Sequence, residues 1–136
     1  MTDPTVIRET PAERPEGELT VQTLAMPANT IPAGDIFGGW IMSLMDVAGG
    51  ITATRIANGW VATVTVTDMT FLRPVKVGDV VACYTDLVRV GRTSLTLRVE
   101  AWVLRQRIGD RIQVTHADFK YVALDEAGKP RPLPQG

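Results

Sequence analysis

The sequence predicts an α+β domain in which an antiparallel β-sheet wraps around one long central helix. One strand-like segment is followed by a single apolar run of helical length, and four strand-like segments come after it. With 136 residues, the chain is long enough for one domain and too short for two. One apolar helix and one sheet have one stable way to cover each other, so we expect the sheet to curl around the helix.

Both ends of the chain have the composition of tails. Residues 1–17 hold three prolines among charged side chains, and residues 126–136 (EAGKPRPLPQG) are similar. Segments of this kind are typical of chain ends that stay outside the core. We therefore expect the domain to span residues 18–125, with an extended or mobile tail at each end.

The first strand and the helix occupy the first half of the domain. Polar and apolar residues nearly alternate over residues 18–26, which predicts a strand, and a loop rich in turn residues follows at 27–35. The helix is predicted over residues 37–57 and ends at Asn58-Gly59, a pair common at helix C-termini. Glycines at four of its positions would cost an isolated helix about 0.8–1 kcal/mol each, so burial and function must justify them.

Four strands are predicted after the helix. Val and Thr are frequent and apolar residues alternate over most of each segment, which predicts strands at residues 60–75, 79–90, 93–107 and 111–125. The sequence KVGD between the first two is a tight turn. The links at Gly91 and Gly109 are of hairpin length, so the strands that they join should be antiparallel neighbours.

The overall composition excludes several classes of protein. The net charge is −1 and the Lys and Arg residues form no basic run, so we expect no nucleic-acid partner. The N-terminus lacks the regions of a signal peptide, and no apolar stretch approaches the roughly 18 residues of a membrane span. The single cysteine, Cys83, rules out an internal disulfide framework and fits a reducing compartment. We therefore expect a soluble, cytoplasmic protein without a membrane partner.

Asp46 is the one carboxylate of the apolar helix predicted over residues 37–57, which begins in the stretch GDIFGGWIMSLMDVAGG. An ionised carboxylate in such a helix is costly to bury unless it is paired or faces a cleft. Its neighbours at helical spacing are Met42, Ser43, Gly49, Gly50 and Ala53. This face of mostly small residues lets another chain or a ligand come close. Two interpretations stay open: a solvated or capped acid on an exposed helix side, or a general base or nucleophile at the edge of a crevice.

Gly38 and Gly39 lie where the helix is predicted to begin. The first four backbone N–H groups of a helix have no partner within it, and without side chains they stay open to a ligand oxygen. Such a place can stabilise the oxyanion of an acyl-transfer intermediate. The alternative is that these glycines allow close packing against a neighbouring strand.

The spacing between the glycine pair and Asp46 leads to a prediction about the number of subunits that form one site. Gly38 and Asp46 are eight residues apart, so on one helix they lie roughly 12 Å apart along the axis. Groups that act on one carbonyl must lie within about 3–3.5 Å of it. If both residues are catalytic, they must come from two subunits with antiparallel helices, which predicts an obligate dimer with sites shared across its interface.

Other chemically capable residues are weaker candidates. His116 is the only histidine and lies in an alternating strand, where a structural or exposed role is the more common one. Ser43 and Ser94 have no base nearby in the sequence, so a Ser-His-Asp mechanism would rest on His116 alone. Cys83 lies in an apolar strand, as a core cysteine does. No His, Cys, Asp or Glu cluster has the spacing of metal ligands.

Several basic residues lie near the predicted turns. Arg73, Arg89 and Arg92 could meet phosphate groups there, although solvated strand ends are the more common role of such residues. Lys76, which also lies near a turn, could meet phosphate groups in the same way.

The segments GDIFGGWIMSLMD, MTFLRPVKVGD and FKYVAL together resemble the hotdog-fold acyl-CoA thioesterases, in particular the YciA-like group related to the brain-type acyl-CoA hydrolases. The resemblance covers roughly residues 19–134. It implies the hotdog fold, a dimer with a continuous sheet, and a trimer of such dimers. It also implies hydrolysis of acyl-CoA thioesters to free acid and CoA, without a metal or other cofactor.

The resemblance implies roles for the residues singled out above. Asp46 matches the helix carboxylate that acts as base or nucleophile. The backbone N–H of Gly38 or Gly39 would polarise the thioester carbonyl in the site of the other subunit. Arg73, Arg89 and Arg92 become candidate contacts for CoA. Whether the acid activates water or forms a mixed anhydride stays open.

One position departs from the family pattern. Relatives carry Asn or Gln in the loop about seven residues before the glycine pair, and this chain has Ile31. Losing a polar group that contacts the oxyanion costs on the order of 10²-fold in rate, and the change could equally alter the substrate preference. A non-catalytic acyl-CoA-binding protein therefore stays open as the alternative. A hotdog dehydratase would need a histidine near the helix, and only His116 is available.

Overall fold

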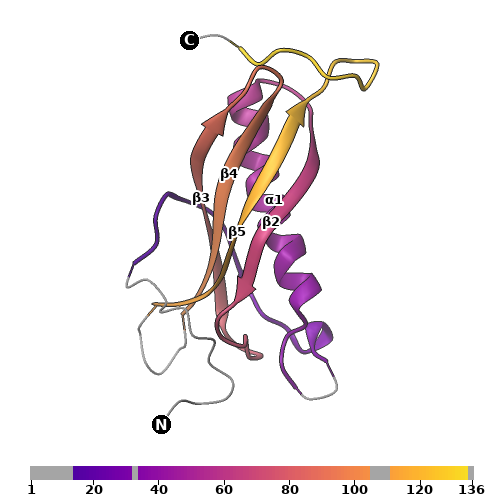
Figure 1. Ribbon diagram of the computed structural model, residues 1–136. Coiled ribbons are helices and arrows are strands. Elements are labelled where there is room, and N and C mark those ends of the chain that lie inside the picture. Colours follow the sequence, from indigo (N-terminus) through magenta and orange to yellow (C-terminus); the bar gives the residue numbers. More distant parts are fainter. Residues whose placement is uncertain (1–13, 32–33, 105–110, 135–136) are drawn as a thin grey trace.

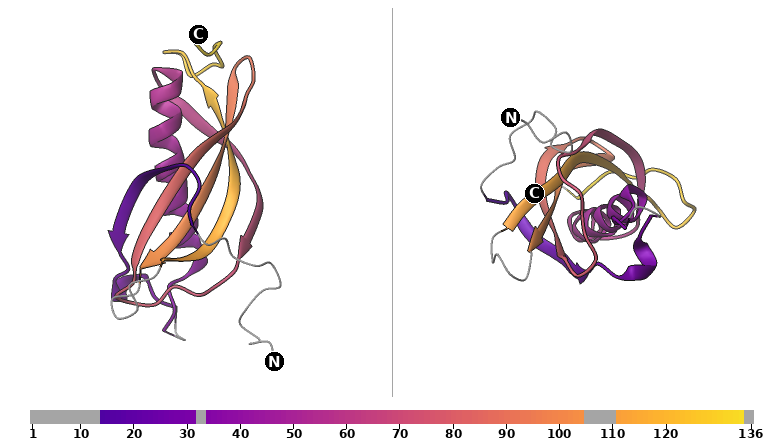
Figure 2. Two further views of the ribbon diagram at one scale, coloured as in Figure 1. Left: turned by 90° about the vertical axis from the view of Figure 1, so that its left-hand side faces the viewer. Right: turned by 90° about the horizontal axis from the view of Figure 1, so that it is seen from below.

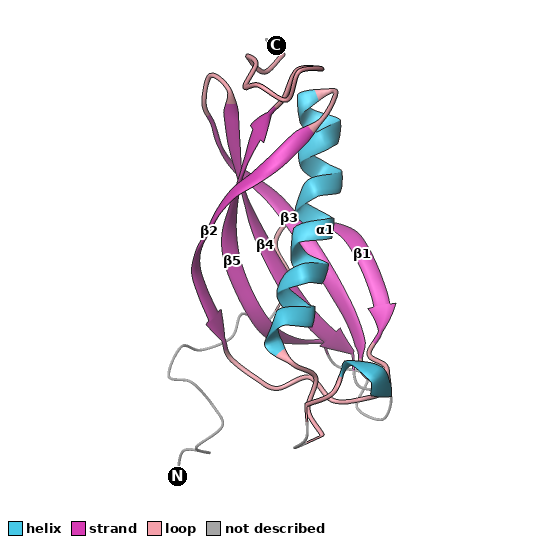
Figure 3. Ribbon diagram, turned by 90° about the vertical axis from the view of Figure 1, so that its right-hand side faces the viewer, coloured by secondary structure: helices cyan, strands magenta, loops and turns pink. Residues whose placement is uncertain are grey.

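One long helix, α1 (Gly38–Ala57), lies along the inner face of a five-stranded antiparallel sheet (Figure 1). The structure is a computed structural model that describes residues 14–31, 34–104 and 111–134. The strands are β1 (Glu18–Leu24), β2 (Val61–Phe71), β3 (Val80–Val90), β4 (Ser94–Leu104) and β5 (Arg111–Ala123), and a short 3-10 helix, η1 (Pro27–Asn29), follows β1. Figures 2 and 3 show from other sides that the sheet curls around α1, which confirms the predicted fold class.

The strands lie in the order β1-β3-β4-β5-β2. β3 pairs with β4 and β4 with β5, as their short links predict, although the link at Gly109 lies outside the described residues. β2 precedes β3 in the chain but pairs with β5, so the segment between β2 and β3 crosses from one edge of the sheet toward the other. β1 and β2 are thus the two edge strands.

The strand predicted at residues 60–75 ends earlier, at Phe71. Leu72 and Val75 are buried, and the Leu72 N–H donates to the Val114 carbonyl at 2.6 Å. Pro74 has no N–H to donate to a ladder, and it restricts the backbone of the residue before it. The chain therefore leaves the sheet edge here and starts its crossing.

The core lies between α1 and the inner face of the sheet. The sheet contributes buried residues of β3, β4 and β5, namely Val81, Cys83, Leu95, Leu97, Val99, Ala101, Val103, Val114, Ala117, Phe119, Tyr121 and Ala123. The buried residues of α1 are Ile41, Met45, Ala48, Gly49, Thr52, Ala53 and Ala57. Most of these helix residues are small, so the helix axis can lie close to the sheet.

The opposite side of α1 is open and partly apolar. The side chains of Met42, Val47 and Ile51 are exposed, although they lie in the middle of a helix that the sequence predicts to be buried. Within this chain, the sheet covers only one side of the helix. The exposed side adjoins the edge strand β2.

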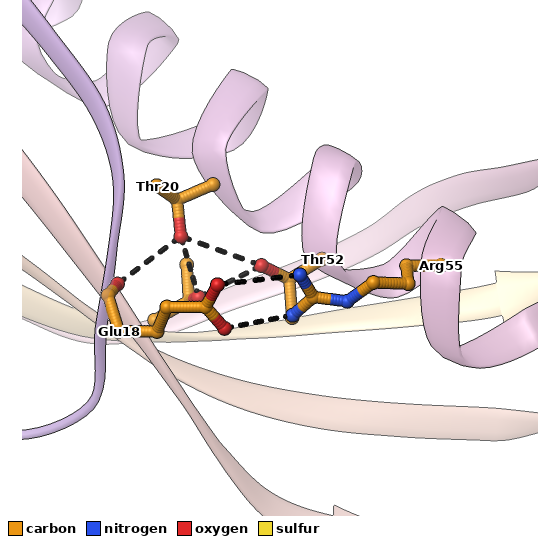
Figure 4. A network of polar contacts seen from close by, with 5 residues as sticks. Glu18, Thr20, Thr52 and Arg55 are labelled. Atoms are coloured by element: carbon orange, nitrogen blue, oxygen red, sulfur yellow. Dashed lines mark hydrogen bonds and ion pairs between the residues drawn. The ribbon is translucent and has the colours of Figure 1, made fainter.

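Polar contacts fasten the other edge strand, β1, to the helix (Figure 4). The buried hydroxyl of Thr52 lies 2.8 Å from that of Thr85, which in turn lies 2.9 Å from that of Thr20. At the surface, Arg55 pairs with Glu18 at 2.9 Å. The three hydroxyls satisfy one another, as buried polar groups must.

The helix ends where the sequence predicts. Phe37 precedes its first residue with φ −72° and ψ 145° and makes no side-chain cap. At the other end, Asn58 adopts the left-handed conformation with φ 53°, and its N–H donates to the Thr54 carbonyl. Asn is one of the few residues that tolerates this conformation at a helix C-terminus.

The C-terminal segment differs from the predicted tail. Leu133 is only 6% exposed, and its N–H donates to the Arg92 carbonyl at 2.9 Å. Arg131 donates from Nη2 to the Ala57 carbonyl at 2.8 Å and from Nε to the Leu124 carbonyl at 2.9 Å. Residues 126–134 therefore fold back over the end of α1, because the helix carbonyls there need donors and Leu133 finds an apolar contact. Of the predicted N-terminal tail, residues 1–13 lie outside the described part.

None of the helices in the described ranges is long and apolar enough to cross a membrane.

Candidate active site

Asp46 is half-buried on α1, and two hydroxyl groups of the sheet hold its carboxylate. Thr63 of β2 donates from Oγ1 to Asp46 Oδ1 at 2.7 Å. Tyr121 of β5 has its hydroxyl 3.0 Å from the same Oδ1 and 3.1 Å from the backbone carbonyl of Asp46. Thr63 and Tyr121 are directly opposite each other in the β2–β5 ladder, so one cross-strand pair supplies both donors.

Gly49 makes the contact between Tyr121 and Asp46 possible. A Cβ atom on Gly49 would lie 2.1 Å from the Tyr121 hydroxyl oxygen. Gly49 thus allows a close approach beside Asp46, but the group that approaches is a side chain of the same chain, whereas the sequence predicted another chain or a ligand. Gly50 has nothing within 4 Å of the corresponding position, so packing within the chain does not require it.

Tyr121 is a hydrogen-bond donor in this site and not a base. Burial raises the pKa of its phenol well above the ordinary value, and the charge of Asp46 and the hydrogen bond to it raise it further. The phenol therefore keeps its proton at neutral pH. A protonated phenol can donate to a carboxylate, which can only accept.

Asp46 lies in the wall of an open hollow of about 530 Å³. The other walls come from the exposed side of α1 and from β2 and β5, and they are Val47, Gly50, Ile51, Thr54, Val61, Thr63 and Tyr121. An acid at the edge of such a hollow can act on a bound molecule. Of the two interpretations of Asp46, the structure therefore favours the acid at a crevice edge.

Gly38 and Gly39 start the helix, and Gly38 is also a packing residue. A Cβ atom on Gly38 would lie 3.1 Å from the ring of Phe71, which is tighter than an ordinary contact. A Cβ atom on Gly39 would meet only the ring of Phe37, at 3.4 Å. Close packing thus explains Gly38 in part, whereas Gly39 has no such structural need.

Gly38 lines a second hollow, of about 380 Å³. Its walls are mostly apolar and include Ile31, Ile36, Ile41, Phe71, Arg73 and Val75. Ile31 is the residue that replaces the expected Asn or Gln, and it lies in this wall with 40% of its surface exposed. The position beside the helix start thus carries an aliphatic side chain instead of a polar one.

The structure does not bring Gly38 and Asp46 into one site within this chain. The two residues line different hollows, at the start of α1 and two turns further along it. This agrees with the spacing argument, by which a site that uses both must draw on two subunits.

The three candidate arginines do not gather in this chain either. Arg73 follows β2 at the end of the sheet where α1 begins, and its buried Nε has no hydrogen-bond partner among the described residues. Arg89 lies near the opposite end, in a polar hollow that also includes Asp118 and Lys120. Arg92 is exposed in the turn between β3 and β4.

The remaining candidates lie away from Asp46. His116 is five residues from the inward-facing Tyr121 along an unbroken stretch of β5, so it faces the outer side of the sheet. A dehydratase that needs a histidine beside the helix therefore finds none here. Ser94 lines the polar hollow around Arg89. Cys83 is buried, and this burial raises the pKa of its thiol to about 12, so the thiol is not a nucleophile.

In the ranges that the structure describes, no group of three or more His, Cys, Asp or Glu side chains could hold a metal ion.

Sequence reasoning missed Thr63 and Tyr121. Thr63 is one of several threonines in an alternating strand, and nothing distinguishes it from Thr65 or Thr67 before the sheet is known. Gly49, three residues after Asp46, was the available signal, because it indicated a close approach beside the acid. Which side chain approaches depends on the pairing of β2 with β5.

The sequence and the fold are similar to those of known thioesterases. Residues 33–110 match the family described as the thioesterase superfamily. Over 123 residues the chain is 57% identical to the acyl-CoA thioester hydrolase YciA of Salmonella typhimurium, a match that covers 88% of this chain and 92% of that protein. Among solved structures, a hexameric thioesterase of Yersinia pestis gives a TM-score of 0.86 at 55% identity, covering 90% of this chain and 100% of that one. A hexameric broad specificity acyl-coenzyme A thioesterase gives a TM-score of 0.85 at 49% identity, covering 90% and 84%.

Proposed function

This chain belongs to the thioesterase superfamily and has the hotdog fold, and we infer that it is an acyl-CoA thioester hydrolase, which releases a free acid and CoA. The identity to curated hydrolases over most of both chains supports the reaction class. The structural observation that carries the proposal is the carboxylate of Asp46, held by two hydroxyls at the wall of an open hollow.

Asp46 is the catalytic acid–base or nucleophilic residue of this proposal. Both hydroxyls bind Oδ1, so Oδ2 is the oxygen that can take a proton from water or attack the thioester. In the first route, the oxygen of a water molecule bonds to the carbonyl carbon while Asp46 takes a proton from that water. The carbon–sulfur bond then breaks, and the proton passes from Asp46 to the leaving thiolate. In the second route, Oδ2 displaces the thiolate, and water then hydrolyses the anhydride.

The oxyanion site is proposed to come from the partner subunit. The start of α1 has no side-chain cap and Gly38 lines the hollow beside it, so the free N–H groups of Gly38 and Gly39 are the donors that we expect to stabilise a negative oxygen. Because these glycines lie roughly 12 Å from Asp46 along the helix axis, only a second copy with its helix antiparallel can complete the site.

The exposed side of α1 and the edge strand β2 are the proposed dimer interface. β2 has a neighbour on one side only, and an unpaired strand edge is a template for a strand of another chain. Val47 and Ile51 of the helix and Val64 of β2 are about half exposed in the single chain, and pairing would bury them. The hexameric relatives fit a trimer of such dimers.

The three arginines are proposed as contacts for the phosphate groups of CoA. Arg73 lies at the end of the sheet where α1 begins, and Arg89 and Arg92 lie at the other end. Antiparallel helices in a dimer bring opposite ends of two chains together. A phosphorylated substrate could thus meet Arg73 of one subunit together with Arg89 or Arg92 of the other.

We propose a broad acyl-chain range for this enzyme and a cytoplasmic location. One of the similar solved enzymes is described as having broad specificity. The hollow beside Gly38 is open and mostly apolar, with Ile31 in its wall, so it suits an acyl chain without demanding one length. The one cysteine is free and buried, which suits a reducing compartment.

The proposal is tested with purified protein, a panel of acyl-CoA substrates and an assay of thiol release. We expect turnover by the parent protein, and loss of about 10²–10⁴-fold in kcat for Asp46→Asn, which keeps the size of the side chain. Asp86→Asn, at an exposed position of β3, is the matched control. Full activity of Asp46→Asn would show that the assignment is wrong. Saturable binding of acyl-CoA without thiol release would favour the alternative, a non-catalytic acyl-CoA-binding protein.

A further inference from the structure

We propose that Tyr121 and Thr63 are positioning residues, whose hydroxyl groups together hold Asp46 Oδ1 so that Oδ2 faces the substrate. The proposal deepens the function proposed above and rests on it. It starts from two contacts: Thr63 Oγ1 donates to Oδ1 at 2.7 Å, and the Tyr121 hydroxyl lies 3.0 Å from the same oxygen.

The direction of both hydrogen bonds follows from the chemistry of the groups. A carboxylate oxygen only accepts, so Thr63 donates to Oδ1, and the single proton of the Tyr121 hydroxyl is shared between Oδ1 and the Asp46 carbonyl oxygen. Two donors on one oxygen fix the plane of the carboxyl group, which otherwise turns freely about its last bond. The two oxygens of Asp46 are therefore no longer equivalent: Oδ1 is saturated by the protein, and Oδ2 is available for chemistry.

The Tyr121 donor is held by burial, and Thr63 is placed by its pairing with it. Thr63 and Tyr121 form a cross-strand pair in the β2–β5 ladder, so the backbone sets their separation. The Tyr121 ring is 1% exposed and stacks with Phe119 at 6.4 Å between centroids. A buried ring in a fixed rotamer holds its hydroxyl within the narrow limits that a catalytic geometry demands.

The helix leaves room for this arrangement only because residue 49 is glycine. The Tyr121 hydroxyl occupies the space in which a side chain of Gly49 would stand, one turn after Asp46. The same hydroxyl lies 3.1 Å from the Asp46 carbonyl, so it touches both the backbone and the side chain of the acid. The Gly49 backbone, the Tyr121 ring and the Asp46 carboxylate thus form one packed unit.

The test compares Tyr121→Phe and Thr63→Val with matched controls that change the same groups elsewhere. Tyr84→Phe removes the other tyrosine hydroxyl, and Thr23→Val removes a threonine hydroxyl of β1, at the sheet edge opposite β2. We expect each of the two site variants to lower kcat about tenfold or more with KM within about twofold, because misplacement of a reacting group by about 1 Å costs up to 10²-fold. The controls should keep the parental kcat.

Two further variants separate positioning from stability. Thr63→Ser keeps the hydroxyl, and we expect it to recover most of the kcat that Thr63→Val loses. In the double variant the two losses in kcat should combine to less than their product, because both hydroxyls act on one carboxylate.

The proposal is overturned if both site variants keep a kcat within about twofold of the parent while Asp46→Asn is inactive. It is also overturned if Thr63→Ser is as slow as Thr63→Val, or if the controls lose as much activity as the site variants. Full activity of Asp46→Asn would instead contradict the proposed function itself, because that function depends on the Asp46 carboxylate.

Discussion

Gly49 of α1 and Tyr121 of β5 touch so closely that a side chain on Gly49 could not fit: its Cβ atom would stand 2.1 Å from the tyrosine hydroxyl oxygen. This contact sets the distance between the helix and the sheet beside Asp46. It also explains why the helix keeps a buried glycine in its middle, where glycine is a poor helix former.

The stability of the protein should therefore respond in opposite directions at two adjacent glycines. Gly49→Ala forces an atom against Tyr121, and overpacking of this kind costs typically about 1–3 kcal/mol. Gly50→Ala meets nothing within 4 Å, so it should gain up to about 1 kcal/mol from the better helix propensity of alanine. Chemical denaturation of both variants measures the difference. Equal free energies of unfolding for the two variants would contradict the close contact between Gly49 and Tyr121.

The N–H group at the helix start can be removed without breaking the helix. Phe37 has φ −72° and ψ 145°, the extended conformation that a following proline demands, and proline suits the first helical position. We expect Gly38→Pro to lower kcat by roughly 10²-fold if its N–H stabilises the oxyanion. Gly38→Ala keeps the N–H and adds the clash with Phe71, so it is the steric control. Equal activity of the two variants would argue against a role for this N–H group.

Sites shared between subunits predict complementation. Subunits carrying Asp46→Asn and subunits carrying Gly38→Pro are each inactive as pure assemblies under the proposed mechanism. In a mixed dimer one of the two sites receives an intact Asp46 and an intact Gly38, so random mixing should restore about a quarter of the parental activity. Co-expression with two different tags, followed by the thiol-release assay, measures it. Mixed assemblies without activity would place both residues in the site of one subunit.

The C-terminal segment should contribute to stability through Arg131. Its guanidinium donates to carbonyls of Ala57 and Leu124 and places a positive charge at the end of α1, where the helix dipole favours it. We expect Arg131→Ala to lower the free energy of unfolding by about 1–3 kcal/mol. Arg131→Lys should recover only part, because a lysine cannot reach both carbonyls with a planar fork. Lys129→Ala, at an exposed neighbouring position, should have little effect, and a loss equal to that of Arg131→Ala would refute the capping role.

Stability should fall on the alkaline side partly because of Cys83. Burial raises the pKa of its thiol to about 12 from the ordinary 9.0, so at intermediate pH the unfolded chain ionises while the folded chain does not. The folded state then binds more protons. This contribution to stability is therefore intact below about pH 9 and is lost toward pH 12, by at most roughly 1.4 kcal/mol per pH unit.

The variant Cys83→Ala should make this alkaline loss of stability less steep. The measurement is the free energy of unfolding by urea between about pH 8 and about pH 11, where linkage predicts the change in slope. Tyr121 contributes with the same sign, because burial and Asp46 raise its pKa as well, so some slope should remain. An unchanged slope in Cys83→Ala would mean that the thiol ionises equally in both states.

The kinds of elements and their order along the chain could be predicted from the amino-acid sequence. Periodicity and capping residues are local properties, so the helix over residues 38–57 with its Asn58-Gly59 end and the hairpin neighbours β3, β4 and β5 could be predicted from them. The candidate acid and the glycine pair could also be found, because a lone carboxylate in an apolar helix and bare glycines at a helix start are unusual in themselves.

The neighbours of the functional residues, in contrast, depend on the tertiary fold. β2 lies at the far edge beside β5, and this pairing puts Thr63 and Tyr121 opposite each other and against Asp46. Residues 126–134 do not form the predicted tail, because Arg131 donates to a carbonyl at the end of α1, 74 positions earlier in the chain. Such contacts form between segments far apart in the sequence, and they depend on which apolar faces cover one another. A local sequence pattern can therefore identify a residue at such a position, but it cannot identify the residue that this one contacts.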